Sequence, residues 1–445
     1  MTAGNRVVNE IAVMNETTTK KRVLILASKM GYQTRGFAEA AEKLGVGVVF
    51  GTDRCHQLEN PWGDDALALH FENAQEAAGE IERAVGTDSV RAVIALGDRP
   101  TVAGAYASVA LGVPGNPPEA VEICRSKLRQ RETLRAAGVR VPDFFVFSAS
   151  DDFREVLARV KFPCVVKPLS LSASQGVIRA NNEEEFAAAV RRIWMLMESP
   201  EIQVLREPGL DRLLVEAYVP GREMAVEGLI DQGRLRVLAI FDKPDPLEGP
   251  YFEETIYVTP SRMPSEVQTA IERDTARAIQ VLGLTTGPVH AEFRVNEEGP
   301  WVLEVAPRPI GGLCSRSLRF GPGRISLEEL LLRHALGLEG SDLEREAAAS
   351  GVMMIPVPRS GIFEGVDGIE EAEKISGVAE IRITARLRDY VAAWPEGASY
   401  LGFIFSRGDS AAGVETALRA AHAVLQFRFS PRLPVEHPVT RKMEN

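Results

Sequence analysis

The segment 287–309, with the sequence GPVHAEFRVNEEGPWVLEVAPRP, contains charged residues whose types and spacing could support phosphoryl transfer. Apolar and polar residues alternate on both sides of the turn sequence NEEGP, which predicts an antiparallel hairpin. If the turn centres on Glu298, then Glu292 and Glu304 stand directly opposite each other on one face, with Cβ atoms roughly 5 Å apart. Two carboxylates this close repel each other unless a cation lies between them.

Arg308 follows the second of these acids by four residues and is flanked by Pro307 and Pro309. Two paired acids and one fixed guanidinium are what a magnesium-dependent phosphoryl-transfer site requires. Any one acid alone would be explained more simply as surface charge on a hairpin. The prediction of a catalytic site therefore depends on the whole constellation.

A lysine in an apolar strand is the next candidate. Lys167 lies in the sequence CVVKP, and burying a lysine in such a run is costly without an anionic partner. The alternative is an edge strand from which the lysine reaches solvent. The loop 170–176 that follows offers three hydroxyls, a freely turning Gly176 and several backbone N–H groups. Such a loop could cover a phosphate, although a plain Ser-rich turn is an equally good interpretation.

Two further segments are weak signals when each is taken alone, and they indicate a nucleotide site only in combination with the other motifs. Lys127, in the sequence CRSK, would alone be a solvated helix charge. The sequence LLVEAYVPGRE at 213–223 is an apolar strand that leads into a Pro-Gly turn. Backbone groups at such a turn could pair with the edge of adenine, and a carboxylate just beyond could hold ribose hydroxyls.

Composition restricts the class of protein. The chain has 445 residues, 45% of them hydrophobic, and a net charge of −11 from 51 basic and 62 acidic residues. An acidic chain without charge blocks argues against nucleic acid or an anionic membrane as the main partner. Apolar runs all fall short of the roughly 18 residues needed to cross a bilayer. The four widely spaced cysteines, Cys55 included, are expected to be buried free thiols in a reducing cytoplasm.

The order of elements predicts an α/β and α+β protein of several domains. Strands at 23–27, 46–50 and 91–96 alternate with helices at 34–44 and 74–85, which predicts a small parallel sheet covered by helices. A single helix is expected at 119–137, and the polar segment 198–210 is expected to be a mobile insertion. We expect a disordered tail at 1–20, an N-terminal α/β domain at 21–118, a linker helix and lid at 119–212, a catalytic domain at 213–345 and a C-terminal α+β domain at 346–435.

The succession of these motifs from about Val23 to Gly337 resembles the ATP-grasp superfamily. The stretch PGNPPEAVEICRSKLRQRETLRAAGVRVP at 114–142 looks like the region around that superfamily's first ATP-contacting lysine. Two further blocks, FDKPDPLEGPYFEETIYVTP at 241–260 and WPEGASYLGFIFSRG at 394–408, look more specifically like the bacterial L-amino acid ligase group of carboxylate–amine ligases. The resemblance implies an ATP-grasp fold with a Rossmann-like N-terminal domain, a mobile lid and a C-terminal α+β domain.

The resemblance also implies roles for individual residues. Glu292 and Glu304 would hold Mg²⁺ or Mn²⁺, and Arg308 would steady an acyl-phosphate. Gly311 and Gly312 would let the substrate approach the backbone. The residues implied in ATP binding are Lys127 and Lys167 at the phosphates, Ser172, Ser174, Gln175 and Gly176 in a flap over them, Glu216, Ala217, Tyr218 and Val219 at the adenine, and Glu223 at the ribose.

One position departs from the pattern of the family. The family usually has the sequence E-x-N-P-R at the second metal-binding acid, and here Ala306 replaces the Asn. This removes one oxygen ligand for a second metal ion, although two bridging glutamates could still hold a pair of ions.

Together with these motifs, the resemblance implies an ATP-dependent ligase that joins a small carboxylic acid to an amine, with amino acids as the expected substrates. Glu253 or Glu254 could assist the amine, and a solvated pair of charges is an equally good interpretation of these two residues. The alternatives are a biotin-carboxylase-like or formate-using ATP-grasp enzyme, and a nucleotide-binding protein without catalysis. The sequence does not determine the oligomeric state, and a homodimer is the assembly considered.

Overall fold

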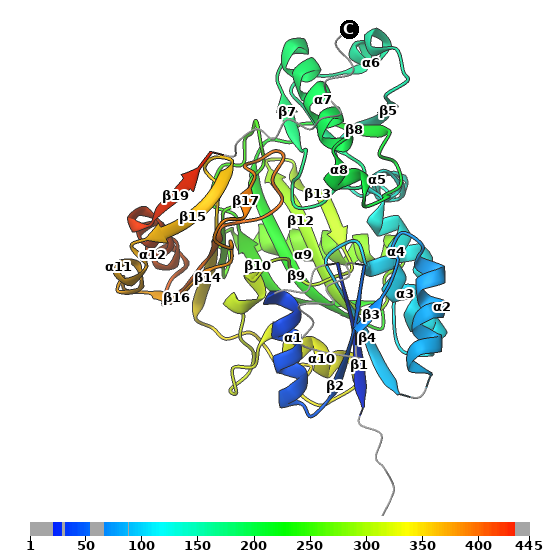
Figure 1. Cartoon of the computed structure of the whole chain (residues 1–445), viewed down its shortest axis with the longest axis vertical. Helices are drawn as coiled ribbons and strands as arrows, with labels where there is room; N and C mark the ends of the chain where they lie inside the picture. Colours follow the sequence, from blue (N-terminus) through cyan, green and yellow to red (C-terminus); the bar gives the residue numbers. More distant parts are fainter. Residues whose placement is uncertain (1–20, 29–31, 54–65, 88, 432–445) are drawn as a thin grey trace, which may run out of the picture.

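The computed structural model describes residues 21–28, 32–53, 66–87 and 89–431 of the chain. The tail expected at 1–20 and Cys55 lie outside these residues, whereas Cys124, Cys164 and Cys314 are buried free thiols as expected. Figure 1 shows an N-terminal region at the bottom, a lid at the top and a broad central sheet between them, which the yellow-to-red C-terminal segment extends on the left.

The N-terminal region is a parallel sheet of four strands in the order β3-β2-β1-β4. In the central strand Val23 and Ile25 face one hydrophobic core while Leu24 and Leu26 face another, so an uninterrupted apolar run is what this doubly covered strand needs. The elements are β1 (Arg22–Ala27), α1 (Tyr32–Lys43), β2 (Gly47–Thr52), β3 (Ala66–Ala68), α2 (Ala74–Val85), β4 (Val90–Leu96) and α3 (Thr101–Ala110). The sequence did not predict α3, because most of its residues are buried and it lacks an amphipathic period.

The single helix expected at 119–137 is wrong. Two helices, α4 (Pro118–Arg125) and α5 (Lys127–Ala136), meet at Ser126, whose backbone is extended. The Ser126 hydroxyl accepts a hydrogen bond from the Arg129 N–H at 3.3 Å, as an N-cap residue does. Lys127 is therefore the first residue of a new helix.

The lid is an antiparallel sheet of four strands in the order β5-β8-β6-β7, packed on helices. Its elements are β5 (Phe144–Ser148), α6 (Phe153–Arg159), β6 (Cys164–Pro168), β7 (Ile178–Ala180), α7 (Glu183–Met197), α8 (Pro200–Gln203) and β8 (Arg212–Ala217). Because β8 pairs with both β5 and β6, the boundary expected at residue 213 is misplaced, and the lid sheet runs to Ala217.

The segment 198–210, expected from its polar sequence to be a mobile insertion, has structure of its own. It contains α8, whose Ile202 is buried in the lid core. Glu207 forms ion pairs with Arg99 at 2.5 Å and with Arg125 at 2.9 Å, so it joins the lid to the N-terminal region.

The central sheet has eight strands in the order β13-β12-β9-β10-β11-β14-β18-β16. Its first five strands and their helices are β9 (Arg222–Asp231), β10 (Arg234–Asp242), β11 (Ile256–Thr259), α9 (Ser265–Leu282), β12 (Gly287–Asn296), β13 (Gly299–Ala306), the short 3₁₀ helix η2 (Cys314–Ser317) and α10 (Leu327–Ala335). The chain enters from the lid through Gly221, with φ of 121°. A Cβ there would lie 2.2 Å from the Val295 carbonyl oxygen, so only glycine fits this turn.

The segment at 346–435, where a C-terminal α+β domain is expected, contains both helices and strands, and it shares a sheet with the catalytic strands. Three of its strands complete the central sheet, and the other three form a small sheet in the order β17-β15-β19. The elements are β14 (Ala349–Ile355), β15 (Gly361–Asp367), α11 (Ile369–Glu373), β16 (Val378–Ile383), β17 (Tyr390–Val391), β18 (Gly402–Gly408), α12 (Ala411–Val424) and β19 (Gln426–Ser430). A shared sheet fixes this segment relative to the catalytic strands.

The alternation of side chains along β9 and β12 sorts apolar from polar residues. Val289, Ala291, Phe293 and Val295 of β12 enter the core under α9, so the residues between them face the other side of the sheet. That other side carries His290, Glu292 and Arg294 from β12 and Glu223 and Glu227 from β9. The strands thus assemble a charged face from residues far apart in sequence.

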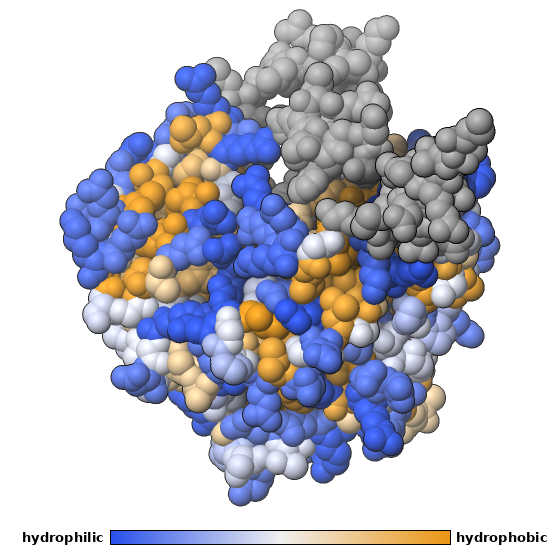
Figure 2. Space-filling model, turned by 90° about the horizontal axis from the view of Figure 1, so that it is seen from below, coloured by the Kyte–Doolittle hydropathy of each residue, from blue (hydrophilic) through white to orange (hydrophobic). Residues whose placement is uncertain are grey.

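In the part of the chain that the structure describes, no helix has both the length and the apolar character to cross a bilayer. The surface seen from below in Figure 2 is a mosaic of hydrophilic and hydrophobic residues.

Candidate active site

The hairpin of β12 and β13 places Glu292 directly opposite Glu304, as the sequence predicts. The residues nearer the turn pair differently from the expectation, because a turn centred on Glu298 would place Val295 opposite Trp301. Asn296 pairs with Gly299, so the loop has two residues, and Val295 faces Pro300 rather than Trp301. A bulge at Leu303 adds the residue that restores the expected pairing.

The strand β13 lies at the edge of the sheet, and helix α5 supplies hydrogen-bond partners for backbone groups on its open side. The Gln130 side chain donates to the Val305 carbonyl at 2.8 Å and accepts from the Val305 N–H at 3.0 Å. Arg131 donates to the Leu303 carbonyl. Side chains from α5 therefore stand in for a missing neighbouring strand and hold the bulge next to Glu304.

The electrostatic surroundings of the two acids differ. Burial would raise the pKa of Glu292, but Lys243, His290 and Arg308 outweigh it and hold this pKa well below its usual range. The Glu304 carboxylate makes neither a hydrogen bond nor an ion pair within the described residues. An ionised acid facing an unpaired, half-buried acid fits a divalent cation, because carboxylate oxygens are the ligands that Mg²⁺ prefers.

A second group of acids lies beside the hairpin. Ligand oxygens of Glu223, Glu254 and Glu292 lie within 4.8 Å of one another. The buried Lys243 already neutralises this group, because its Nζ is 2.8 Å from Glu223, 3.5 Å from Glu292 and hydrogen-bonded to Glu254. The hairpin pair, where Glu304 is unpaired among the described residues, is therefore better suited to a cation than this cluster.

Lys127 and the flap, residues 170–176, lie next to Glu304. Asp98, Lys127, Ser172 and Glu304 line one small cavity, and the Lys127 ammonium donates to the Leu171 carbonyl. Burial, together with Lys167 and Arg125, lowers the pKa of Lys127 although Glu304 and Asp98 act in the opposite direction. The helix start at Ser126 is what aims this lysine at the second acid.

Lys167 has the anionic partner that its apolar strand requires. Its Nζ is 2.5 Å from Glu216, and the other oxygen of Glu216 accepts from the Nε of Arg131 at 2.7 Å. Burial would raise the pKa of Glu216, but Arg131 and Lys167 together lower it. The side chain of Glu216 thus positions Lys167, and only its backbone could serve the adenine.

In the hinge after β8, some backbone groups are already hydrogen-bonded to other parts of the protein. The Ala217 N–H donates to Asp143 at 2.8 Å, and the Tyr218 N–H donates to Pro163 at 3.0 Å. The Tyr218 carbonyl and the Val219 N–H have no hydrogen-bond partner among the described residues. One acceptor and one donor side by side match the edge of adenine.

Glu223 lies just beyond this hinge, at the start of β9. Its carboxylate accepts from Lys243 at 2.8 Å and from Arg294 at 3.2 Å. Arg294 also donates to the Tyr218 hydroxyl at 2.9 Å. The residue expected at the ribose is therefore held between two cations at the edge of the hinge.

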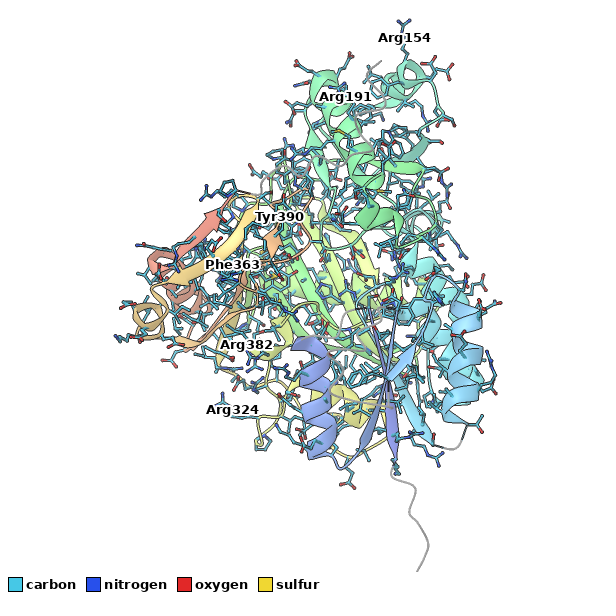
Figure 3. The ribbon with its side chains drawn as sticks, in the orientation of Figure 1. Arg154, Arg191, Arg324, Phe363, Arg382 and Tyr390 are labelled. Carbon is cyan, nitrogen blue, oxygen red and sulfur yellow. The ribbon has the colours of Figure 1, made fainter. Side chains whose placement is uncertain are left out.

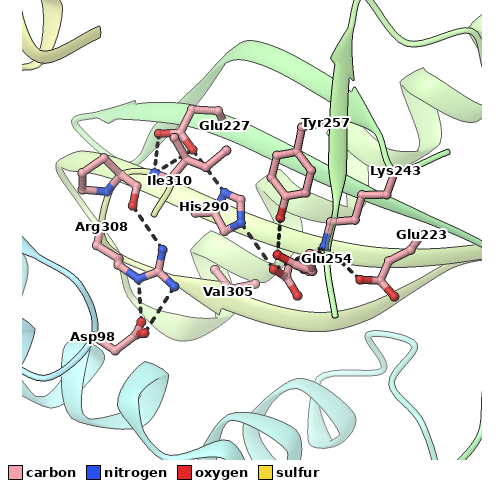
Figure 4. A network of polar contacts seen from close by, with 12 residues as sticks. Asp98, Glu223, Glu227, Lys243, Glu254, Tyr257, His290, Val305, Arg308 and Ile310 are labelled. Carbon is pink, nitrogen blue, oxygen red and sulfur yellow. Dashed lines mark hydrogen bonds and ion pairs between the residues drawn. The ribbon is translucent and has the colours of Figure 1, made fainter. Parts of the chain in front are cut away.

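Arg308 faces Asp98 across the boundary with the N-terminal region. The guanidinium grips the carboxylate with two donors, at 2.6 and 3.3 Å (Figure 4). Burial would raise the pKa of Asp98, but Arg308, Arg125 and Lys127 keep it below its usual value. The loop at the end of β4 thus positions the arginine.

A buried pair, His290 and Glu227, supports the floor of the site. The His290 Nδ1 lies 3.2 Å from Glu227, and the Ile310 N–H donates to both Glu227 oxygens at 3.1 and 3.2 Å (Figure 4). Burial would lower the pKa of His290, but Glu227 and Glu292 raise it to about 9. This pair fixes the chain just before Gly311 and Gly312.

The two acids considered for the amine have separate surroundings. Glu254 is bound to Lys243 and accepts from the Tyr257 hydroxyl at 2.7 Å. Among the residues that the structure describes, Glu253 accepts a hydrogen bond only from the Val357 N–H, at 3.3 Å, and burial raises its pKa to about 7. Glu253 is therefore the acid of the two that is suited to accept a proton.

Sequence reasoning missed Lys243, Glu227 and Asp98 as parts of the site. Lys243 and Glu227 could have been found by the argument applied to Lys167, since each follows or interrupts a run of apolar strand residues. Asp98 ends a parallel strand, where open α/β sheets often place ligand-binding groups, but no motif marks its contact with Arg308.

Comparison with known proteins bears on this geometry. Residues 160–317 match the ATP-grasp domain, and residues 353–430 match the L-amino acid ligase C-terminal domain 2. The crystal structure of an L-amino acid ligase from Bacillus licheniformis superimposes with a TM-score of 0.78 and 28% identity, covering 93% of this chain and 100% of that one.

Two relatives in sequence cover less of the chain. The protein y4rH of Sinorhizobium fredii is 26% identical over 325 residues, which are 72% of this chain and 64% of that protein. An alanine–anticapsin ligase of Bacillus amyloliquefaciens is 25% identical over 299 residues, or 62% of each chain. The chain thus spans less than two thirds of either relative.

These findings confirm the resemblance inferred from the sequence. The chain has the ATP-grasp fold. It carries an ATP-grasp domain followed by an L-amino acid ligase C-terminal domain.

Proposed function

We propose that this protein is an ATP-dependent carboxylate–amine ligase that joins amino acids through an acyl-phosphate. The observation that carries the proposal is the hairpin pair Glu292 and Glu304, which stands among three cationic side chains. Lys127 and Arg308 come from separate elements, and Lys167 comes from the lid. A triphosphate bound next to these three cations would have positive charge close to its oxygens. Negative charge on those oxygens increases during phosphoryl transfer, and the cations would stabilise it.

The proposed reaction has two displacements. A carboxylate oxygen of the first substrate attacks the γ-phosphorus, and the bond to the β-phosphate oxygen breaks to release ADP. The amine nitrogen of the second substrate then attacks the acyl carbon, the bond to phosphate breaks, and the amine loses a proton. The protein contributes positions and charges rather than a covalent bond.

Individual residues have distinct tasks in this scheme. Lys127 and Lys167 bind phosphate oxygens, and Arg308, held in place by Asp98, orients the acyl-phosphate. When bound, Mg²⁺ or Mn²⁺ between Glu292 and Glu304 would neutralise phosphoryl oxygens. The flap 170–176 covers the phosphates and excludes water that would hydrolyse the intermediate.

Glu253 is proposed to accept the proton of the attacking amine. A general base works best when its pKa lies near the working pH, and burial raises the pKa of Glu253 to about 7. Glu254 is less suited, because Lys243 and Tyr257 already occupy its oxygens.

Amino acids are proposed as substrates because of the relatives. The neighbours are named as ligases of amino acids, and the match to the C-terminal domain of such ligases covers a part of the chain that the ATP-grasp model does not. A screen of amino-acid pairs for ADP release and amide formation tests the proposal. ADP release that requires both an acid and an amine would support it. Nucleotide binding without turnover for every pair would favour the rival, a nucleotide-binding protein, which only Ala306 suggests.

A further inference from the structure

The segment WPEGASYLGFIFSRG at 394–408 has no role in the scheme above. Its second half is β18, which is explained by the central sheet. Its first half, Trp394–Glu396, lies in the turn between β17 and β18, on the side of the C-terminal segment that faces the lid (Figure 1). The contacts of this turn lead to the flap.

Three consecutive residues of the turn bind the flap. The Trp394 Nε1–H donates to the Ala173 carbonyl at 3.2 Å, the Pro395 carbonyl accepts from the Gly176 N–H at 2.9 Å, and the Glu396 carbonyl accepts from the Gln175 side chain at 2.7 Å. Every contact falls within the loop 170–176 that is proposed to cover the phosphates. Three hydrogen bonds from adjacent residues join these two parts of the fold.

An ion pair adds a second attachment to the lid. The Arg192 guanidinium on α7 binds the Glu396 carboxylate with two donors, at 2.5 and 3.0 Å, and binds the Tyr251 hydroxyl at 2.5 Å. The neighbouring Arg191, which is labelled on the lid in Figure 3, is exposed. Only one of the two adjacent arginines therefore reaches the C-terminal segment.

The two sides of this junction differ in rigidity. Trp394 is 6% exposed, and its ring centre lies 5.0 Å from that of Tyr400, so the turn is anchored in the C-terminal core. In the flap, Ala173 and Ser174 both have φ of 55°, a left-handed conformation that costs about 1–2 kcal/mol for each residue with a side chain. Such a loop keeps its shape only where contacts hold it.

We infer that Trp394–Glu396 is a clamp that positions the phosphate flap, so that the C-terminal segment holds the nucleotide site closed. This inference rests on the proposed function for its consequence in catalysis. A flap that is not clamped would let water reach the acyl-phosphate, and ADP would then be released without amide formation. Trp394 and Glu396 are positioning residues, because they act through the flap and touch no substrate.

Hydrogen exchange of residues 170–176 tests the clamp without reference to ligation. Arg192→Glu and Glu396→Arg should each speed exchange of the flap by about two- to fivefold, the range expected for an exposed ion pair, both without ligand and with a non-hydrolysable ATP analogue. The double variant should bring exchange back toward the parent, because it restores the pair with reversed charges. Arg191→Glu, the matched control one residue away, should leave the flap unchanged.

The second measurement is the amount of ADP released for each amide bond that is formed. Trp394→Phe keeps the packed ring and removes the indole donor, so the ratio of ADP released to amide formed should rise by about two- to tenfold and the KM for ATP should rise with it. Trp301→Phe is the matched control, since its indole donates at 3.2 Å to Asn296, outside the flap.

The outcomes separate the two proposals. Equal flap exchange in parent, Arg192→Glu and Glu396→Arg would overturn the clamp, as would an equal effect of Arg191→Glu or no recovery in the double variant. If the parent forms no amide with any amino-acid pair, the proposed function fails, and the exchange measurements still decide on the clamp.

Discussion

Replacing Lys167 and Glu216 in separate variants should separate nucleotide binding from lid stability, although the two residues belong to one ion network. In Lys167→Ala, Glu216 keeps its bond to Arg131 at 2.7 Å, so the lid retains a paired core. In Glu216→Gln, the Arg131 guanidinium, whose side chain is 2% exposed, loses its counter-charge, because the amide oxygen and the Leu303 carbonyl are both neutral acceptors.

The two variants should therefore differ in their melting temperature and in their affinity for ATP. Breaking a buried ion pair by removing one partner costs about 3–5 kcal/mol, so Glu216→Gln should lower the melting temperature of the ligand-free protein by several degrees. Lys167→Ala should lower it far less. A lost charge-assisted contact to phosphate is worth about 1.5–3 kcal/mol, so this variant should bind ATP about 10- to 150-fold more weakly.

Thermal melting with and without ATP distinguishes the two effects, because at a given concentration a ligand of the folded state raises the melting temperature more when it binds more tightly. Lys161→Ala, an exposed lysine of the lid, serves as control and should behave like the parent. An equal stabilisation of Lys167→Ala and parent by ATP would refute the phosphate contact. Equal destabilisation by Lys167→Ala and Glu216→Gln would refute the assignment of Glu216 to the support of Arg131.

Three further variants test other parts of the site. Glu304→Gln should abolish metal-dependent turnover, because a lost metal contact removes several kcal/mol of transition-state stabilisation, while circular dichroism shows an intact fold; turnover near that of the parent would exclude Glu304 as a ligand. Arg308→Lys should leave ATP affinity by calorimetry nearly unchanged and lower product formation at least about tenfold, since lysine keeps the charge and loses the two-donor grip on Asp98; ligation at the parent rate would contradict this. Because the base must be ionised, ligation should rise as the pH increases through about 7, and a pH–rate profile of Glu253→Gln should lack this limb.

The stability of the protein should depend on pH in the opposite sense for the same acid. Burial raises the pKa of Glu253 in the folded state from 4.5 to about 7, so the folded protein binds more protons than the unfolded chain between these values. Glu253 should therefore lower the free energy of unfolding as the pH rises from about 4.5 to about 7, and Glu253→Gln should flatten this dependence.

The hairpin shows how far local pattern carries a prediction. Alternation along 287–306 predicts that Glu292 and Glu304 face each other, and they do. The same reasoning assumed an unbroken register about Glu298. A two-residue loop shifts the pairing by one residue, and the bulge at Leu303 shifts it back. The bulge depends on Gln130 and Arg131 of α5, which no local pattern connects to β13.

Long-range partners account for most of what the sequence did not reveal. Lys167 was predicted to need an anion, but nothing in the sequence selects Glu216, which becomes its neighbour only because β6 and β8 are adjacent strands. Likewise, the sequence places Arg308 after the second acid and cannot show that Asp98 holds it. Strand pairing and domain packing decide these contacts, and both are global properties of the fold.

The contacts of the ligand-free protein suggest how ATP binding proceeds. Each cation assigned to the nucleotide or the intermediate already has a protein partner: Arg308 binds Asp98, Lys167 binds Glu216, and Lys127 donates to the Leu171 carbonyl. Buried charges that lacked such partners would destabilise the apo protein. In the proposed function, phosphate oxygens would compete with these partners, and ATP binding would exchange one set of ion pairs for another. Because Asp98 and Glu216 remain close by, they can keep the Arg308 and Lys167 side chains in place while the phosphates share them, so these two cations would be paired both before and after the nucleotide binds.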